Sequence, residues 1–163
     1  MSEWTVRRAT AADSRAVVEL RALMFSAMGV AGVDATDWRR AAVEWFEREL
    51  GSPRACAVVA VDPGGRVVAG AMGGLRFETP SPVNPNGVWG VLNNVATQPE
   101  ARRRGLARAC VLGVLDWFRD ETDASVVELF ATGEGAGLYE ELGFRPTAWP
   151  AMRLRLVPSS ATD

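Results

Sequence analysis

The sequence predicts an α/β (α+β) fold, a mixed central β-sheet of about six or seven strands that is flanked by helices on both faces. Three observations carry this prediction. At 163 residues the chain is long enough to bury one real core. Apolar segments with strand character are joined by a hairpin turn in the first half of the chain. A strand–helix–strand unit then follows, which suggests a mixed sheet with helices on both faces.

The first fifty residues contain one short strand and two helices. Residues 4–8 are expected to form the strand, and Asp13 is a good N-cap for the first helix. Thr36 or Asp37 can cap the second helix. Gly51 follows that helix, where a C-terminal glycine is common.

A predicted β-hairpin comes next. Its two apolar strands, residues 55–61 and 67–75, are joined by Asp62-Pro63-Gly64-Gly65, a turn by composition. Residues 79–87 contain three prolines and two asparagines, so they are expected to form a loop. The strand after this loop is predicted over residues 89–97.

The second half begins with a long amphipathic helix, predicted over residues 104–121. A strand at 125–131, a short helix at 134–142 and a last strand at 152–156 follow. One domain is therefore expected over residues 1–157, and a disordered tail over 158–163.

Composition excludes several kinds of chemistry. The chain has no histidine, and all 18 of its basic residues are arginine, so histidine-activated nucleophiles, P-loops and lysine Schiff bases are excluded. A net charge of −2 gives no reason to expect nucleic acid or an anionic membrane as a partner. Two cysteines without metal-ligand spacing predict no metal site and fit a reducing cytoplasm. No signal peptide or membrane span is visible, so a cytoplasmic location is expected.

Residues 95–108 have the pattern of an anion-binding loop between a strand and a helix. Arg102, Gly105 and Ala107 fit the spacing [RQ]-x-x-G-x-[GA]. A helix N-terminus presents N–H groups without intrahelical partners and carries a partial positive charge. Arginines there oppose the helix dipole, which is unfavourable unless an anion binds. A solvated basic helix start is the alternative, but the loop predicts a phosphorylated ligand.

A second segment, Leu138-Tyr139-Glu140-Glu141-Leu142-Gly143-Phe144, sharpens this prediction. Together the two segments resemble the GNAT superfamily of acyl-CoA-dependent N-acyltransferases. That family has V-x-V-x-P-x-x-R-x-x-G-x-[GA] at its cofactor loop and L-Y-x-x-L-G-F further on. The resemblance extends over nearly the whole chain and is strongest from Val95 to Phe144.

The resemblance implies acetyl-CoA as cosubstrate, bound where two neighbouring parallel strands splay apart. It implies that strand backbone contacts the pantetheine arm and the thioester carbonyl, and that N–H groups of the loop surround the pyrophosphate. The cofactor-binding residues it implies are Val95, Ala96, Thr97, Arg103, Arg104, Gly105, Leu106, Ala107, Arg108 and Thr132. Thr97 replaces the valine and Thr132 the asparagine that relatives often have, and both changes keep a main-chain or hydroxyl donor.

The resemblance also implies two catalytic residues, Tyr139 and Glu128. Tyr139, the only tyrosine, matches the family residue that protonates the CoA thiolate, and packing of its ring is the alternative. The strand before the loop has Asn93 and Asn94 where relatives often have a glutamate base. Neither accepts a proton, although either can hold a water or orient the substrate. Glu128 on the following strand matches a second base position with a shift of one residue, and a solvent-facing edge residue is an equal alternative.

The sequence therefore predicts a cytoplasmic N-acetyltransferase that moves an acetyl group from acetyl-CoA directly to a primary amine. A small-molecule amine is favoured over a protein as acceptor. A homodimer stays open, because dimers are common in similar proteins but no interface is visible. The runner-up is a non-catalytic acyl-CoA-binding sensor or regulatory module. A generic nucleotide-binding domain fails to explain Leu138 to Phe144.

Overall fold

The computed structural model describes residues 4–157, which fall in two compact units, Met1–Phe130 and Ala131–Asp163. The first unit holds the sheet and the three long helices, and the second holds one short helix. In chain order the strands and helices are β1 (Thr5–Arg8), α1 (Ser14–Ala27), α2 (Thr36–Glu49), β2 (Ala55–Val61), β3 (Val67–Phe77), β4 (Val88–Thr97), α3 (Leu106–Glu121), β5 (Val126–Glu128) and α4 (Ala136–Glu141). Short 3-10 turns, Ala11–Asp13 and Pro99–Ala101, precede α1 and α3.

The strands of the first unit form one mixed sheet in the order β1-β2-β3-β4-β5. Strands β1 to β4 run antiparallel to one another, each to the next, and β5 runs parallel to β4. The predicted hairpin is confirmed, since the N–H of Gly65 donates to the carbonyl of Asp62 at 2.9 Å between β2 and β3. The mixed α/β fold class is thereby confirmed.

The described residues form five strands rather than about six or seven. The predicted last strand, residues 152–156, has no regular secondary structure. Its alternating sequence, Met-Arg-Leu-Arg-Leu, has the period of a strand, but a strand also needs a neighbouring chain to bond with. The predicted tail, residues 158–163, lies outside the described residues.

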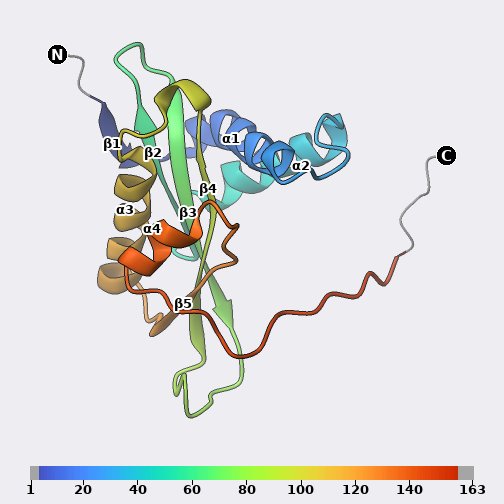
Figure 1. The fold of residues 1–163 in the computed structure, drawn as a ribbon, viewed down its shortest axis with the longest axis vertical. Helices are drawn as coiled ribbons and strands as arrows, with labels where there is room; N and C mark the ends of the chain where they lie inside the picture. The colour runs from blue at the N-terminus through green and yellow to red at the C-terminus, as the bar shows by residue number, and fades with distance from the viewer. Residues whose placement is uncertain (1–3, 158–163) are drawn as a thin grey trace. The chain divides into compact units, whose positions relative to one another are not determined.

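Helices cover both faces of the sheet (Figure 1), with α1 and α2 on one side and α3 on the other. Every residue of β2 is buried, and its side chains alternate between the two layers. Ala57 and Val59 belong to a cluster with residues of α1 and α2, whereas Val58 contacts Gly113 of α3. A strand buried on both faces explains why this segment is an unbroken apolar run.

The starts of the first two helices differ in part from prediction. Asp13 does occupy the N-cap position of α1, but its carboxylate accepts hydrogen bonds from Arg7 and from the N–H of Thr10. The paired Arg7 guanidinium lowers the pKa of Asp13 below its ordinary value. For α2 the predicted caps are wrong, because the N-cap is Ala35, which has no side-chain oxygen to offer.

Two glycines let α3 approach the sheet closely. A Cβ atom built on Gly73 of β3 would lie 2.6 Å from Val114 and 2.7 Å from Phe118. Gly90 of β4 faces the same Phe118 ring, and a Cβ atom built on Gly90 would lie 2.7 Å from a carbon of that ring. Phe118 is 2% exposed, so it cannot move aside without opening the core.

We therefore expect Gly73→Ala to lower the free energy of unfolding by about 1–3 kcal/mol, the usual cost of overpacking. The control is Gly74→Ala on the opposite face, where the nearest atom is the carbonyl oxygen of Arg54 at 4.0 Å. Urea denaturation of both variants measures the difference. Equal free energies of unfolding for the two variants would show that α3 can move away from Gly73 without loss of stability.

Candidate functional site

Strand β4 continues well beyond the end of its parallel neighbour. β5 pairs with β4 only from Trp89 to Val91, where Val91 lies opposite Glu128. On its other side β4 pairs with β3 as far as Thr97. Beyond Val91, no strand of the described residues pairs with the β5 side of β4. Val95, Ala96 and Thr97 therefore lie on a strand edge that can bond with an extended ligand.

A β-bulge interrupts β4 at Asn94 and Val95, between Asn93 and Ala96. Gly70 of β3 pairs with Ala96 of β4, and Met72 pairs with Asn93. An advance of two residues along β3 therefore corresponds to three residues along β4. Asn94 takes a positive φ of 52°, which is uncommon outside glycine. Bulges of this kind are over-represented beside active sites, where they redirect backbone and side chains.

The loop after β4 ends in left-handed backbone at the start of α3. Arg102 donates from Nε to the carbonyl of Thr97 at 3.3 Å, which folds the loop back on the strand end. Arg103 has φ 60° and Gly105 has φ 73°. Glycine adopts this conformation without steric cost, whereas for Arg103 it stores strain. The turn delays the helix, which begins at Leu106 rather than at the predicted Arg104.

The N-terminus of α3 has no side-chain cap. Its N-cap is Gly105, and a Cβ built there would have no atom within 4 Å, so the space above it is open. Leu106 anchors the first turn with a buried side chain. Arg104 stacks its guanidinium over the ring of Trp4 at 5.5 Å. The N–H groups of Leu106 and Ala107 belong to the first turn, so they have no partner within the helix, and no side chain caps them. Uncapped first-turn N–H groups are the arrangement that binds anions at helix N-termini.

Glu128 of β5 lies in a cluster of charges with Arg76 of β3 and Glu78, the residue after β3, rather than alone at an edge. Its Oε2 is 2.8 Å from a terminal nitrogen of Arg76, and Arg76 also lies 2.8 Å from Glu78. The Arg76 guanidinium stacks over Trp89 at 5.4 Å. The hydrogen bond to Glu128 is the main cause that raises the pKa of Arg76. Sequence reasoning missed Arg76, because cross-strand neighbours depend on register.

The second unit contains Tyr139 and Thr132. Tyr139, on α4, is half-buried, and burial raises the pKa of its phenol above the ordinary value. Its ring contacts Phe144 edge-on, with 6.0 Å between centroids. The carbonyl of Thr132 accepts hydrogen bonds from the N–H groups of Gly135 and Ala136, at 3.0 and 3.1 Å, at the start of α4.

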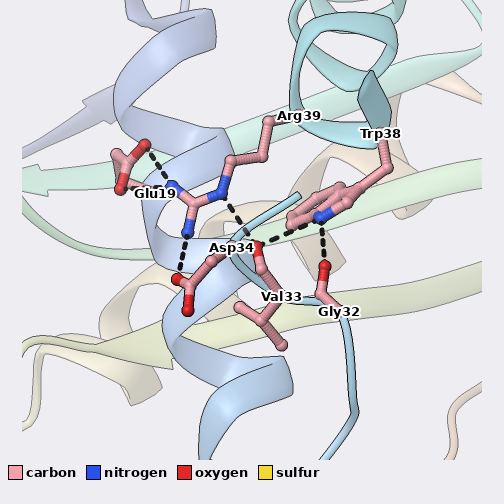
Figure 2. Close-up of polar contacts among 6 residues, drawn as sticks. All are labelled: Glu19, Gly32, Val33, Asp34, Trp38 and Arg39. Carbon is pink, nitrogen blue, oxygen red and sulfur yellow. Dashed lines mark hydrogen bonds and ion pairs between the residues drawn. The ribbon is translucent and has the colours of Figure 1, made fainter. Parts of the chain in front are cut away.

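The segment between α1 and α2 is held by one arginine. Arg39 donates from Nε to the carbonyl of Val33 at 2.9 Å and from a terminal nitrogen to Glu19 at 2.9 Å. The indole of Trp38 donates to the carbonyls of Gly32 and Val33, both at 3.1 Å. Figure 2 shows Trp38 and Arg39 of α2 bonded to this segment, and Glu19 of α1 bonded to Arg39. The link from Arg39 to Glu19 fixes α2 to α1.

The sequence model of the acetyltransferase (GNAT) family matches residues 17–144. This match spans most of the chain, so the chain belongs to that family. The match runs through the bulged strand, the uncapped helix start and the Tyr139 segment.

Solved structures have the same fold. A predicted acetyltransferase from Clostridium acetobutylicum, solved with acetyl-CoA, is 20% identical with a TM-score of 0.81, over 93% of this chain and 96% of that one. A GCN5-related N-acetyltransferase from Ralstonia eutropha JMP134 is 22% identical with a TM-score of 0.81, over 93% and 99%. Glucosamine-6-phosphate N-acetyltransferase from Arabidopsis thaliana is 16% identical with a TM-score of 0.70, over 93% and 98%. No curated protein matches the sequence.

None of the described helices is long and apolar enough to cross a membrane.

Proposed function

We propose that this chain is an N-acetyltransferase that transfers an acetyl group from acetyl-CoA directly to a primary amine of a small molecule. One observation carries the proposal. The same chain has an unpaired edge on β4 and, one loop later, an uncapped helix N-terminus with open space above it. The first suits an extended amide-containing arm, and the second suits a pyrophosphate. Family membership and the acetyl-CoA bound to the Clostridium acetyltransferase support this donor.

In this proposal backbone groups hold the donor. Val95, Ala96 and Thr97 bond with the pantetheine arm along the β4 edge and polarise the thioester carbonyl. The N–H groups of the loop surround the pyrophosphate, and Thr132 adds a hydroxyl donor. The loop residues are Arg103, Arg104, Gly105, Leu106, Ala107 and Arg108. Backbone donors tolerate side-chain change, which accounts for Thr97 in place of valine.

The proposed chemistry needs one proton removed and one supplied. The amine loses a proton before or during attack on the thioester carbonyl, and the departing thiolate gains one. Tyr139, by its place in the family motif, supplies the second proton. Its raised pKa keeps the phenol protonated through neutral pH, which is the state an acid requires.

Glu128 is the proposed base. Its partner on β4, Val91, precedes Val95 by about 13 Å of extended strand. An amine at Val95 therefore needs a chain of more than one water between it and Glu128. Arg76 occupies Oε2 and leaves Oε1 as the oxygen that can accept the proton.

Three separate observations support the proposed acceptor, domain organisation and location. Glucosamine-6-phosphate, the substrate in the name of the Arabidopsis enzyme, is a small amine. The family match crosses the boundary between the two units, which supports one functional domain over residues 1–157. The buried free thiols of Cys56 and Cys110 suit a reducing cytoplasm.

A non-catalytic acyl-CoA sensor is the second candidate. It is favoured by Asn93 and Asn94 in place of a glutamate on β4, and by the ion pair that already occupies Glu128. Release of free thiol from acetyl-CoA that depends on an added amine would exclude this candidate. Acetyl-CoA binding without any such release across a broad amine panel would establish it.

Gly105→Glu is expected to weaken acetyl-CoA binding at least tenfold, about 1.4 kcal/mol, because a carboxylate would meet the pyrophosphate. Calorimetric titration measures the affinity. Gly65→Glu in the β2–β3 turn is the matched control, since Gly65 also has a positive φ and an open Cβ position. It should bind acetyl-CoA like the unmodified protein. Unchanged affinity in Gly105→Glu would remove this loop from the site.

Tyr139→Phe is expected to lower kcat by roughly 10²-fold, within the range of general acid catalysis. The affinity for acetyl-CoA should stay the same, because phenylalanine retains the edge contact with Phe144. Steady-state kinetics and calorimetry separate the two quantities. A parallel loss of binding and turnover would assign Tyr139 to packing.

Glu128→Gln is expected to lower kcat/KM by roughly 10²-fold and to flatten its rise with pH, because glutamine cannot accept the amine proton. Glu78→Gln is the matched control. It removes the same charge from the same partner, Arg76, but lies just after the end of β3. If both variants keep the original pH profile, water alone is the base.

A further inference from the structure

One arginine of the first unit is half-buried without an acidic partner. Arg21, on α1, stacks its guanidinium over the ring of Phe25 at 4.7 Å and donates from a terminal nitrogen to Oδ1 of Asn94. No carboxylate of residues 4–157 lies within ion-pair distance of it. Burial lowers the pKa of Arg21, with no charge to oppose the effect.

Other arginines of the first unit have acidic partners. Arg7 pairs with Asp13, Arg39 with Glu19, and Arg76 with Glu128. Glu19 lies two positions before Arg21 on the same helix, yet it pairs with Arg39 (Figure 2). Taking a charge out of water costs free energy unless an opposite charge or hydrogen bonds compensate it. A single amide oxygen compensates a guanidinium only in part, since the group has five N–H donors.

The remaining donors of Arg21 are open to a ligand. They have no hydrogen-bond partner among the described residues, and none of its nitrogens is among the fully buried atoms without a partner. They therefore reach solvent. A guanidinium with free donors, fixed by a ring and an amide, is pre-organised for a planar carboxylate or a phosphate.

Arg21 also lies beside the proposed point of transfer. Its partner Asn94 is the bulged residue with positive φ, and the next residue is Val95. Asn94 is 6% exposed, and its Nδ2 is 3.5 Å from the sulfur of Met72, so its side chain has little freedom. An anion bound to Arg21 would sit on the α1 face of the sheet, close to the backbone of Val95.

We propose that Arg21 binds an oxyanion of the acceptor, a carboxylate or a phosphate, and so selects amines that also carry an acidic group. This inference rests on the proposed function, because it assigns the acceptor of the same site. Phe25 and Asn94 are positioning residues that hold the guanidinium plane. The acceptor amine then extends from its bound anion toward Val95.

The alternative is that Arg21 only braces the bulge by bonding to Asn94. The two roles differ in one measurable respect. A brace affects every acceptor equally, whereas an anion site affects only acceptors that carry the anion. The test therefore compares acceptors that differ in charge alone.

The experiment measures thiol release from acetyl-CoA with matched amines. Amino acids of increasing chain length are paired with their carboxamides, and aminoalkyl phosphates with the corresponding amino alcohols. We expect kcat/KM to favour one acidic series over its neutral partners at least about tenfold. The series that is favoured distinguishes a carboxylate from a phosphate. In Arg21→Gln that ratio should fall toward one, mainly through KM, and Arg21→Lys should restore part of it.

Arg15→Gln is the matched control, since Arg15 lies on the same helix with an exposed side chain. It should leave the ratio and the rate unchanged. Equal losses for acidic and neutral acceptors in Arg21→Gln would establish the brace and overturn the inference. So would a wild-type protein that binds acetyl-CoA but neither prefers acidic acceptors in turnover nor binds them in calorimetry. Failure to bind acetyl-CoA at all would instead overturn the proposed function, and this inference with it.

Discussion

The two edges of β4 differ in how much of their length pairs with a neighbouring strand, and the candidate site depends on this difference. β3 satisfies one edge over nearly the full strand, while β5 reaches only from Trp89 to Val91 on the other. Backbone N–H and C=O groups on the rest of that edge require water or a ligand as a partner. The bulge at Asn94 lies in the part of β4 that pairs with β3 alone. Hydrogen bonds on one edge only constrain the backbone less than bonds on both edges.

All positively charged side chains around this strand are arginines. Each of Arg7, Arg39 and Arg76 joins two segments through a carboxylate, and these links fix the helix starts and the outer end of β3. Guanidinium suits this use because its donors lie in one plane and its charge persists at all ordinary pH values. Arg21 has the same chemistry, but none of the carboxylates in the part of the chain that the structure describes lies within ion-pair distance of it, so an anion from outside the chain can neutralise its charge.

Sequence reasoning succeeded where local chemistry decides the structure. The Asp62 to Gly65 turn and the apolar run of β2 could be predicted, because turn residues and strand burial leave a short-range signal. It failed where distant neighbours decide. Ala35 caps α2 without a capping side chain, and residues 152–156 have strand period but no strand partner. At the candidate site the loop and Glu128 are named by sequence motif, and their roles stay predictions. The contacts of Arg76 and Arg21 could not, since they depend on the sheet register and on how α1 crosses β4.

The packing of Phe118 against Gly73 and Gly90 has a consequence at the far end of α3. The helix is a stiff rod, and about 18 Å of it separates Phe118 from its first residue, Leu106. Any outward shift of the rod at the two glycines is therefore transmitted along its length as a tilt. The absence of a side chain at Gly73 and Gly90 therefore helps to set the distance between the N-terminus of α3 and the sheet. Substitutions at these glycines should couple the stability of the core to ligand affinity, although neither glycine touches the ligand.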